Sequence, residues 1–316
     1  MAPPAGAAEP VRSRLSRPRG PFRHHAPRCL QPPYQRPYLA TIALWASLAT
    51  LGAALGHVPP FLLTGLGLLA GSLIALPLVR FDVRRLVVPW RTLALGVYGL
   101  FGYHFLLFTA LGQAPAVEAN LVNYLWPLGI VLLAPLLLPG VRLTAAHVGA
   151  ALAGFAGAAI AILGRGGAAA EAPGNAALGF ACAAGAAFIW STYSLGTKRL
   201  ALTGRDFPTA AIGGFGLVSG ALALVCHALL EPAVNLSGRD IALIAALGLG
   251  PLGGAFFLWD KALKLGDARQ IGVLSYLTPL LSTALLLWST GRAISGSVLL
   301  ATVLILGAAV IGTRAR

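Results

Sequence analysis

The chain has 316 residues, of which 57% are hydrophobic and only 10% are charged. Soluble domains are closer to half apolar and a quarter charged, so this composition argues against a soluble globular enzyme. The net charge of +14 would suit a nucleic-acid-binding protein, but the basic residues are spread between the N-terminus and alternate loops. We therefore expect an all-α integral membrane protein that binds no nucleic acid.

The first 36 residues are rich in proline and arginine and contain no apolar stretch of the kind found in a cleavable signal peptide. Such a segment cannot bury enough apolar surface to offset the entropy lost on ordering. We predict that residues 1–36 form a disordered, basic cytoplasmic tail.

Apolar stretches separated by short breaks follow this tail. A membrane-crossing helix needs about 20 mostly apolar residues. On this basis the predicted spans are 37–56, 60–79, 91–112, 116–138, 144–164, 175–197, 208–230, 241–262, 268–289 and 294–313.

The basic residues predict the orientation of these spans. With the N-terminus in the cytoplasm, all but three of the 23 lysines and arginines fall on the cytoplasmic side. The exceptions are Arg165, Arg239 and Arg292. Positive charge concentrates in cytoplasmic loops, so we predict ten spans with both termini in the cytoplasm.

The sequence also contains an internal repeat. Residues 102–128 align without a gap on residues 254–280, and the most distinctive shared pattern is Tyr-Leu-x-Pro-Leu. The match places the third and fourth spans on the eighth and ninth, so the repeat unit has five spans. We predict one five-helix repeat over 37–164 and a second, inverted repeat over 175–313, an architecture in which transporters bind substrate between the halves.

The fourth span carries a polar face. Asn120, Asn123, Tyr124 and Pro127 follow i, i+3, i+4, i+7 spacing, and Trp126 adjoins them. Asparagine is costly in hydrocarbon unless it finds a partner, so this face is predicted to point inward.

The ninth span repeats the pattern with Ser275, Thr278, Pro279 and Ser282, and Tyr276 adjoins them. A proline within a span breaks the hydrogen-bond ladder and kinks the helix, so Pro127 and Pro279 are candidate hinges. Contacts between helices through small polar residues are the competing explanation for both stripes.

Several aromatic residues lie too deep for the belts that mark membrane interfaces. For each residue, core packing and a cavity wall remain open, whereas for the set a substrate cavity is favoured. The deep residues are Trp45, Tyr103, Tyr124, Trp126 and Tyr276, and the set also includes Trp190, Tyr193 and Trp259, which lie in the cytoplasmic halves of their spans. By contrast, Tyr34, Tyr38, Trp90 and Trp288 flank span ends and are predicted belt residues.

Three ionisable residues within the predicted spans are candidate functional residues. His104 is a candidate substrate ligand, with a neutral histidine bonded to a neighbouring helix as the alternative. Glu118 would begin the fourth span and could serve a gate or remain an interfacial carboxylate. Asp260 is a candidate gate residue that could instead pair with Lys264 at i+4.

The sequence contains no phosphate-binding glycine loop, nucleophile elbow or metal-ligand spacing. The cysteines Cys29, Cys182 and Cys226 are far apart and form no zinc motif. We therefore predict no enzyme activity, no catalytic residue, no cofactor and no metal, and any transport would be driven by gradients.

Three segments resemble a known family: VNYLWP at 122–127, AFIW at 187–190 and SYLTP at 275–279. Together with the inverted repeats they resemble the drug/metabolite transporter superfamily of EamA domains, within it the aromatic amino acid exporters. The resemblance covers residues 38–313. It implies that Asn123, Tyr124, Trp126, Trp190 and Tyr276 line a central cavity. One departure is Asp260, because the related exporters have asparagine after the tryptophan.

This resemblance implies export of amino acids across a bacterial inner membrane, chiefly phenylalanine, tyrosine and tryptophan, with threonine and methionine as further candidates. The expected mechanism is alternating access, and the expected partners are an amino acid and the lipid bilayer, with a monomer as the simplest state. A broad-specificity drug or metabolite exporter is the alternative, followed by a membrane channel or a receptor.

Overall fold

The computed structural model describes residues 35–163, 174–290 and 296–315, and within these residues every regular element is helical. The predicted all-α class is therefore confirmed. The predicted tail lies outside the described residues except for its last two positions, which open the first helix. In the described part of the chain, eight helical segments are long and apolar enough to cross a membrane. The first and ninth predicted spans are not among these eight, so the total of ten stays a prediction.

The elements follow the predicted order. They are α1 (Gln35–Ala54), α2 (Pro60–Ser72), α3 (Ala75–Leu78), the 3-10 turn η1 (Val83–Leu86), α4 (Trp90–Val97), the π-helical turn η2 (Tyr98–Gly102), α5 (Tyr103–Gln113), α6 (Ala116–Asn123), α7 (Trp126–Leu137), α8 (Ala145–Leu163), α9 (Ala176–Leu202), α10 (Ala211–Leu230), α11 (Gly238–Leu249), the π-helical turn η3 (Gly250–Gly254), α12 (Ala255–Leu265), α13 (Ala268–Leu274), α14 (Leu277–Thr290) and α15 (Gly296–Arg314). Most predicted ends are within three residues of these bounds. The sixth span runs further, to Leu202, because Lys198 and Arg199 are good helix formers that continue the helix beyond its apolar part.

Two helices are interrupted just before a proline. α6 ends at Asn123 and α7 begins at Trp126, with Pro127 in its first turn. α13 ends at Leu274 and α14 begins at Leu277, two residues before Pro279. Proline has no N–H to donate and its ring clashes with the preceding turn, so each helix restarts around it.

Two other helices contain a π-helical turn. η2 joins α4 to α5, and η3 joins α11 to α12, at positions related by the same sequence offset as the internal repeat. Both turns are rich in glycine, and a Cβ at Gly99 in η2 would overlap the ring of Tyr193. The two turns therefore allow close helix contacts at equivalent places in the two halves of the sequence.

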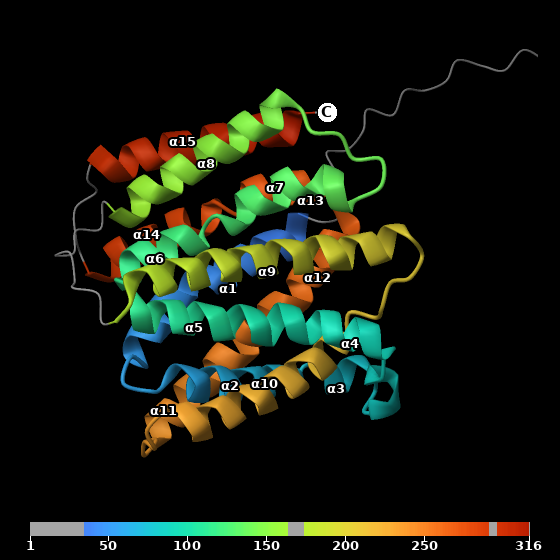
Figure 1. The fold of residues 1–316 in the computed structure, drawn as a ribbon, viewed down its shortest axis with the longest axis vertical. Helices are drawn as coiled ribbons and strands as arrows, with labels where there is room; N and C mark the ends of the chain where they lie inside the picture. Colours follow the sequence, from blue (N-terminus) through green and yellow to red (C-terminus); the bar gives the residue numbers. More distant parts are fainter. Residues whose placement is uncertain (1–34, 164–173, 291–295, 316) are drawn as a thin grey trace, which may run out of the picture. The chain divides into compact units, whose positions relative to one another are not determined.

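Two groups of helices face each other. We call α4, α5, α6, α7 and α9 the α9 group, because α9 packs on α5, α6 and α7. We call α1, α11, α12, α13 and α14 the α1 group, because α1 packs on α12 and α14. α8 packs along α15 and α2 along α10, and Figure 1 shows these two pairs near opposite edges, with α1 and α9 between them.

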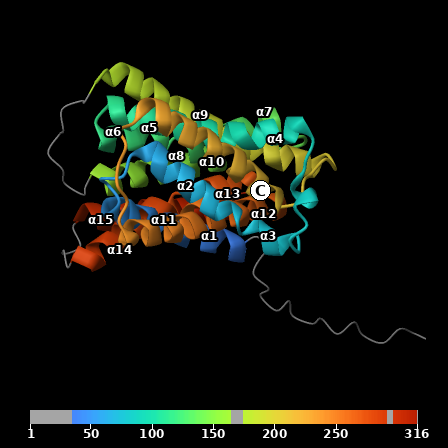
Figure 2. The same cartoon turned by 90° about the horizontal axis from the view of Figure 1, so that it is seen from below.

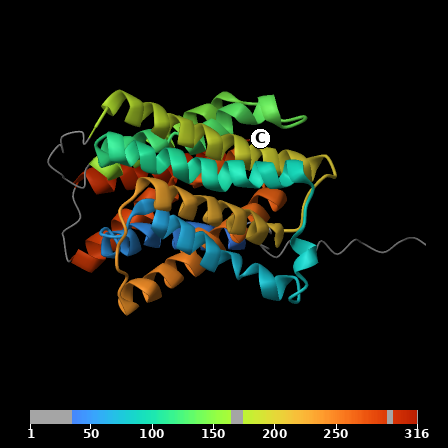
Figure 3. The same ribbon diagram turned by 60° about the horizontal axis from the view of Figure 1, so that its bottom comes forward.

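The loops gather at two ends, which Figures 1, 2 and 3 show at opposite sides of each view. The Pro115 end has the connections at 55–59, 114–115 and 231–237. The Gly266 end has the start of α1, the end of α15 and the connections at 79–89, 138–144, 203–210 and 266–267. Nearly all basic side chains in the loops that the structure describes belong to the Gly266 end, in keeping with the predicted orientation.

Candidate functional site

A cavity of about 420 Å³ lies between the α9 group and the α1 group. Its walls come from the halves of the helices that lead to the Pro115 end. The lining residues are Trp45, Leu48, Gly52, Leu63, Thr64, Tyr103, His104, Leu107, Phe108, Leu111, Asn120, Asn123, Tyr124, Trp126, Ile162, Trp190, Leu247, Leu252, Phe256, Thr278, Pro279 and Ser282. A pocket of about 300–1,000 Å³ with apolar walls and a few polar groups is typical of small-molecule sites.

Aromatic rings form the floor of this cavity. Trp45 of α1 lies with its ring centroid 6.1 Å from Trp126 and 5.8 Å from Trp190. Phe256 of α12 lies 5.6 Å from Trp190 and 6.4 Å from Trp45. We call these four residues the aromatic floor. Because they come from both helix groups, the floor closes the cavity toward the Gly266 end.

Polar atoms stand above the floor. The Asn123 amide donates to the Tyr103 hydroxyl at 3.1 Å. The Nδ1 of His104 is 2.6 Å from the carbonyl oxygen of Leu100. Among the described residues, no hydrogen-bond partner is found for three buried lining atoms: Asn123 Oδ1, Thr64 Oγ1 and Thr278 Oγ1. Buried polar groups are normally paired, so these atoms are candidates for contact with a ligand.

Eight of the predicted site residues line the cavity together, namely Tyr103, His104, Asn120, Asn123, Tyr124, Trp126, Trp190 and Pro279. Seven do not line it, namely Tyr193, Trp259, Ser275, Tyr276, Pro127, Glu118 and Asp260. The residues that do not line the cavity differ from the others in their position along the bundle or in the face of the helix on which they lie.

Tyr276 lies on the far side of its helix from the cavity, contrary to the prediction. Its fully buried ring packs against Phe155 of α8, at a centroid distance of 6.4 Å, and against Ile305 of α15. A Cβ at Gly154 would overlap this ring, so glycine makes room for it. The interruption at 275–276 breaks the helical phase, so the repeat match with Tyr124 does not fix the direction of the side chain.

Trp259 and Tyr193 lie directly behind the aromatic floor. The Trp259 ring is 5.6 Å from Trp126, and its indole N–H donates to the Ser194 hydroxyl at 3.2 Å. Tyr193 packs on Trp190 at 5.4 Å. Both side chains are almost fully buried, so they support the floor in this conformation rather than face a ligand.

The prediction that Tyr38 belongs to an interfacial belt is wrong. Its side chain is 1% exposed, packs 6.3 Å from Trp259 and donates to the Ser275 hydroxyl at 3.3 Å. Ser275 donates in turn to the Ile271 carbonyl at 2.7 Å. Trp90 and Trp288 are highly exposed, as the belt prediction requires.

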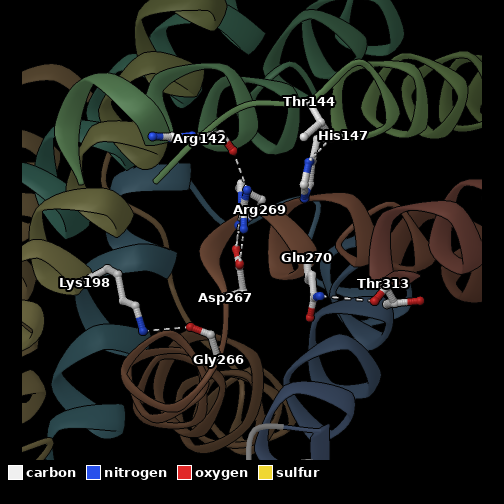
Figure 4. Close-up of polar contacts among 9 residues, drawn as sticks. All are labelled: Arg142, Thr144, His147, Lys198, Gly266, Asp267, Arg269, Gln270 and Thr313. Carbon is white, nitrogen blue, oxygen red and sulfur yellow. Dashed lines mark hydrogen bonds and ion pairs between the residues drawn. The ribbon is translucent and has the colours of Figure 1, made fainter. Parts of the chain in front are cut away.

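Lysines close the bundle beyond Trp259. Asp260 accepts from Lys264 and from the Thr209 hydroxyl, each at 2.7 Å, so the predicted i, i+4 pair is present. Lys264 also donates to the Phe207 carbonyl at 2.6 Å. Lys198 of α9 donates to the Lys264 carbonyl at 3.2 Å and to the Gly266 carbonyl at 2.7 Å, which ties the α9 group to the end of α12. Figure 4 shows the bond to Gly266.

A second tie joins the groups beside it. Figure 4 shows Arg269 between Asp267 and the main chain of Arg142: it pairs with Asp267 at 2.7 Å and donates to the Arg142 carbonyl. Partial burial acts to raise the pKa of Asp267, but hydrogen bonds from the Arg269 side chain and main chain, with its positive charge, hold that pKa below its usual range. The charged Arg269 side chain therefore links α13 to the loop after α7 by a hydrogen bond.

Some cavity residues were not among the predicted site residues. Trp45 was noted as deep but not assigned, although it contacts both floor tryptophans. Thr64 and Phe256 were missed: one threonine or phenylalanine in an apolar helix has no sequence signal that separates a cavity face from a lipid face. Thr278 and Ser282 belonged to the predicted polar stripe, which was a usable signal.

No cluster of three or more His, Cys, Asp or Glu side chains suited to a metal is found in the described part of the chain.

Residues 38–163 and 177–313 match the model of the EamA-like transporter family. The chain belongs to this family. It is thus a multi-pass protein of a transporter family, consistent with a bacterial inner membrane.

Named relatives agree with this assignment. The chain is 45% identical over 275 residues to the aromatic amino acid exporter YddG of Ancylobacter novellus, covering 86% of this chain and 94% of the relative. It is 31% identical over 259 residues to the YddG of Salmonella typhimurium, covering 78% and 85% respectively. A solved crystal structure aligns with a TM-score of 0.80 and 42% identity, covering 89% of this chain and 97% of that one.

Proposed function

We propose that this protein exports amino acids, chiefly phenylalanine, tyrosine and tryptophan, by alternating access through the cavity. The observation that carries the proposal is the aromatic floor beneath buried polar atoms that have no hydrogen-bond partner among the described residues, in a cavity sized for a small molecule. Aromatic side chains of a substrate would stack on the floor, and the polar atoms above it would meet the amino acid head group. The names of the two relatives support the same substrate class.

The proposal includes ten spans, with both termini and the Gly266 end in the cytoplasm. The basic loops of that end support this orientation. The structure would then correspond to an outward-facing state, with the cavity reached from the outside and the cytoplasmic side closed. The interruptions before Pro127 and Pro279 would serve as hinges when the α9 and α1 groups rock.

The two five-helix units, 37–164 and 175–313, form part of the proposal. The matched positions of η2 and η3 and of the two helix interruptions support an internal duplication. Glu118 at the start of α6 and Asp260 beside Lys264 remain proposed gate residues at opposite ends.

The test is counterflow of radiolabelled phenylalanine, tryptophan and threonine in liposomes that contain the purified protein, with and without a pH gradient. Saturable counterflow of the aromatic amino acids is expected. Competition by structurally unrelated cationic drugs at similar concentrations would instead favour a broad drug exporter, and flux without counterflow would indicate a channel. Binding without any flux would indicate a receptor.

A further inference from the structure

One corner of the cavity combines hydrogen-bond acceptors with aromatic faces. Tyr103 lies with its ring centroid 5.1 Å from His104 and 5.2 Å from Trp190. On the other side, Phe256 lies 6.1 Å from His104 and 5.6 Å from Trp190. The four rings therefore surround a common space, and the hydroxyl of Tyr103 brings the Asn123 amide to its edge.

The imidazole of His104 presents an acceptor to this space. Its Nδ1 lies 2.6 Å from the Leu100 carbonyl oxygen, which has no hydrogen to give, so Nδ1 carries the proton. His104 is 5% exposed and its ring packs against the rings of Tyr103, Phe108 and Phe256, an environment in which an unpaired charge is costly. In the neutral ring that follows, Nε2 has a free lone pair. Nε2 is the atom farthest from the helix on a cavity-lining side chain.

Asn123 presents a second acceptor. Its amide nitrogen is engaged with Tyr103, whereas its Oδ1 is buried with no hydrogen-bond partner among the described residues. The side chain is 4% exposed, so water from the bulk does not compensate this oxygen freely. Two acceptors and several aromatic faces together suit a cation that carries N–H groups.

The described lining residues include no lysine, arginine, aspartate or glutamate. A ligand carboxylate would therefore meet hydroxyl groups, such as those of Thr64 and Thr278, and no positive side chain. An ammonium group has the better set of partners, because charge-assisted hydrogen bonds and cation–π contacts act on it together.

We propose that His104 Nε2 and Asn123 Oδ1 bind the primary ammonium group of the ligand, and that this group rather than the carboxylate determines binding. The inference rests on the proposed function for the location of the site. It adds a ligand class: aromatic primary amines that lack a carboxylate also bind in this cavity. Aromatic carboxylates that lack the amine do not.

The test measures binding by quenching of tryptophan fluorescence in the purified full-length protein. The ligands are phenylalanine, phenethylamine, 3-phenylpropionate and trimethyl(phenethyl)ammonium. Phenethylamine is expected to bind within about tenfold of phenylalanine, and 3-phenylpropionate about 10- to 100-fold more weakly, as expected for loss of a charged hydrogen bond. The trimethylated cation has no N–H on its charged nitrogen and should also lose at least about tenfold.

Two variants of one residue test the assignment within the same assay. Asn123→Leu keeps the size but removes the acceptor, and should weaken phenylalanine and phenethylamine equally, by about tenfold. Asn123→Asp adds a negative charge that attracts the ammonium group and repels the carboxylate, so the affinity for phenethylamine relative to phenylalanine should rise above the native ratio. Asn123→Leu is judged by the dissociation constant of each ligand, and Asn123→Asp by the ratio of the two constants in one sample. A misfolded fraction lowers the amplitude of the fluorescence change and alters neither quantity.

Preferred binding of 3-phenylpropionate over phenethylamine would overturn the inference. If trimethyl(phenethyl)ammonium binds as tightly as phenethylamine, the aromatic rings alone recognise the cation, and His104 and Asn123 have no role in binding it. The proposed export function is tested by a separate experiment, the counterflow of phenylalanine in liposomes. Binding of phenethylamine without amino acid flux would keep this inference and reject the exporter.

Discussion

The two ends of the helix bundle are held together in different ways. At the Pro115 end, Glu231 accepts from the Phe61 and Leu62 amides at the start of α2, within the α2–α10 pair, and Asn175 donates to Gln113 between α9 and α5, within the α9 group. At the Gly266 end, Lys198 and Arg269 bridge the α9 group and the α1 group.

This difference bears on alternating access. The ties at the Pro115 end can persist while the two groups move, because one lies within the α2–α10 pair and the other within the α9 group. The ties across the Gly266 end must break if that end opens, so they set the free-energy difference between the two states. The aromatic floor lies between the cavity and the end of the bundle that Lys198 and Arg269 bridge.

The largest expected effect comes from removing the floor. Trp126→Ala takes away edge contacts to Trp45, Trp190 and Trp259 and would join the cavity to the closed half. We expect counterflow of phenylalanine to fall at least about tenfold, since a lost aromatic contact and a looser pocket both weaken binding. The measurement is the initial rate per reconstituted molecule.

Trp126 is 5% exposed, so its truncation also costs roughly 3–5 kcal/mol of packing. Trp126→Phe keeps most of the volume and should recover part of the flux with normal stability. Trp288→Ala, at an 84% exposed tryptophan, serves as the matched control and should leave flux unchanged. Normal counterflow in Trp126→Ala would contradict the role of the floor.

Local sequence signals predicted much of this architecture. The apolar runs predicted where helices lie, and the prolines predicted where α7 and α14 restart, because both effects depend on a few neighbouring residues. The repeat predicted that equivalent positions behave alike, and η2 and η3 occupy such positions. The hydropathy pattern did not predict that α9 extends to Leu202, because charged residues can continue a helix beyond the hydrocarbon core of the membrane.

The site was less predictable, because side-chain direction depends on packing between distant helices. The stripe of Asn120, Asn123 and Tyr124 pointed to the cavity as its spacing indicated. Tyr276 did not, because it lies in a helix interruption where regular spacing fails. Tyr38 resembled a belt residue by position, yet its partner Ser275 is more than two hundred residues away in sequence.

The next effect concerns the bridge at the Gly266 end. Lys198→Met keeps the length of the side chain but removes two hydrogen bonds to the end of α12. We expect this end to open more often, and about tenfold faster labelling of a buried cysteine there, as the loss of one charged hydrogen bond predicts. The probe is Thr197→Cys, at a 1% exposed position, in a chain from which the native cysteines have been removed.

Lys261→Met is the matched control, because Lys261 is exposed and lies on α12 close to the bridged carbonyls. It should leave the labelling rate unchanged. Equal acceleration by both substitutions would show that net charge at this end, and not the bridge of Lys198, keeps it closed.

The smallest effect concerns the pH dependence of the second bridge. The pKa of Asp267 is lower in the folded protein than in the unfolded chain, so its carboxylate adds stability above the unfolded value of about 4. That contribution is lost as the pH falls through the folded-state pKa, when protonated Asp267 no longer pairs with Arg269. Because the pair is partly exposed, we expect the carboxylate to add less than about 1 kcal/mol to the free energy of unfolding, a shift of at most a few degrees in the thermal midpoint.

Asp267→Asn should therefore lower the thermal midpoint at pH 7, and its midpoint should fall less than that of the native protein between pH 6 and pH 3. Asp82→Asn, which removes a more exposed pair with Arg85, should keep the native drop. An unchanged pH profile in Asp267→Asn would mean that the carboxylate adds no charge-dependent stability, and that Arg269 holds this end through the Arg142 carbonyl alone.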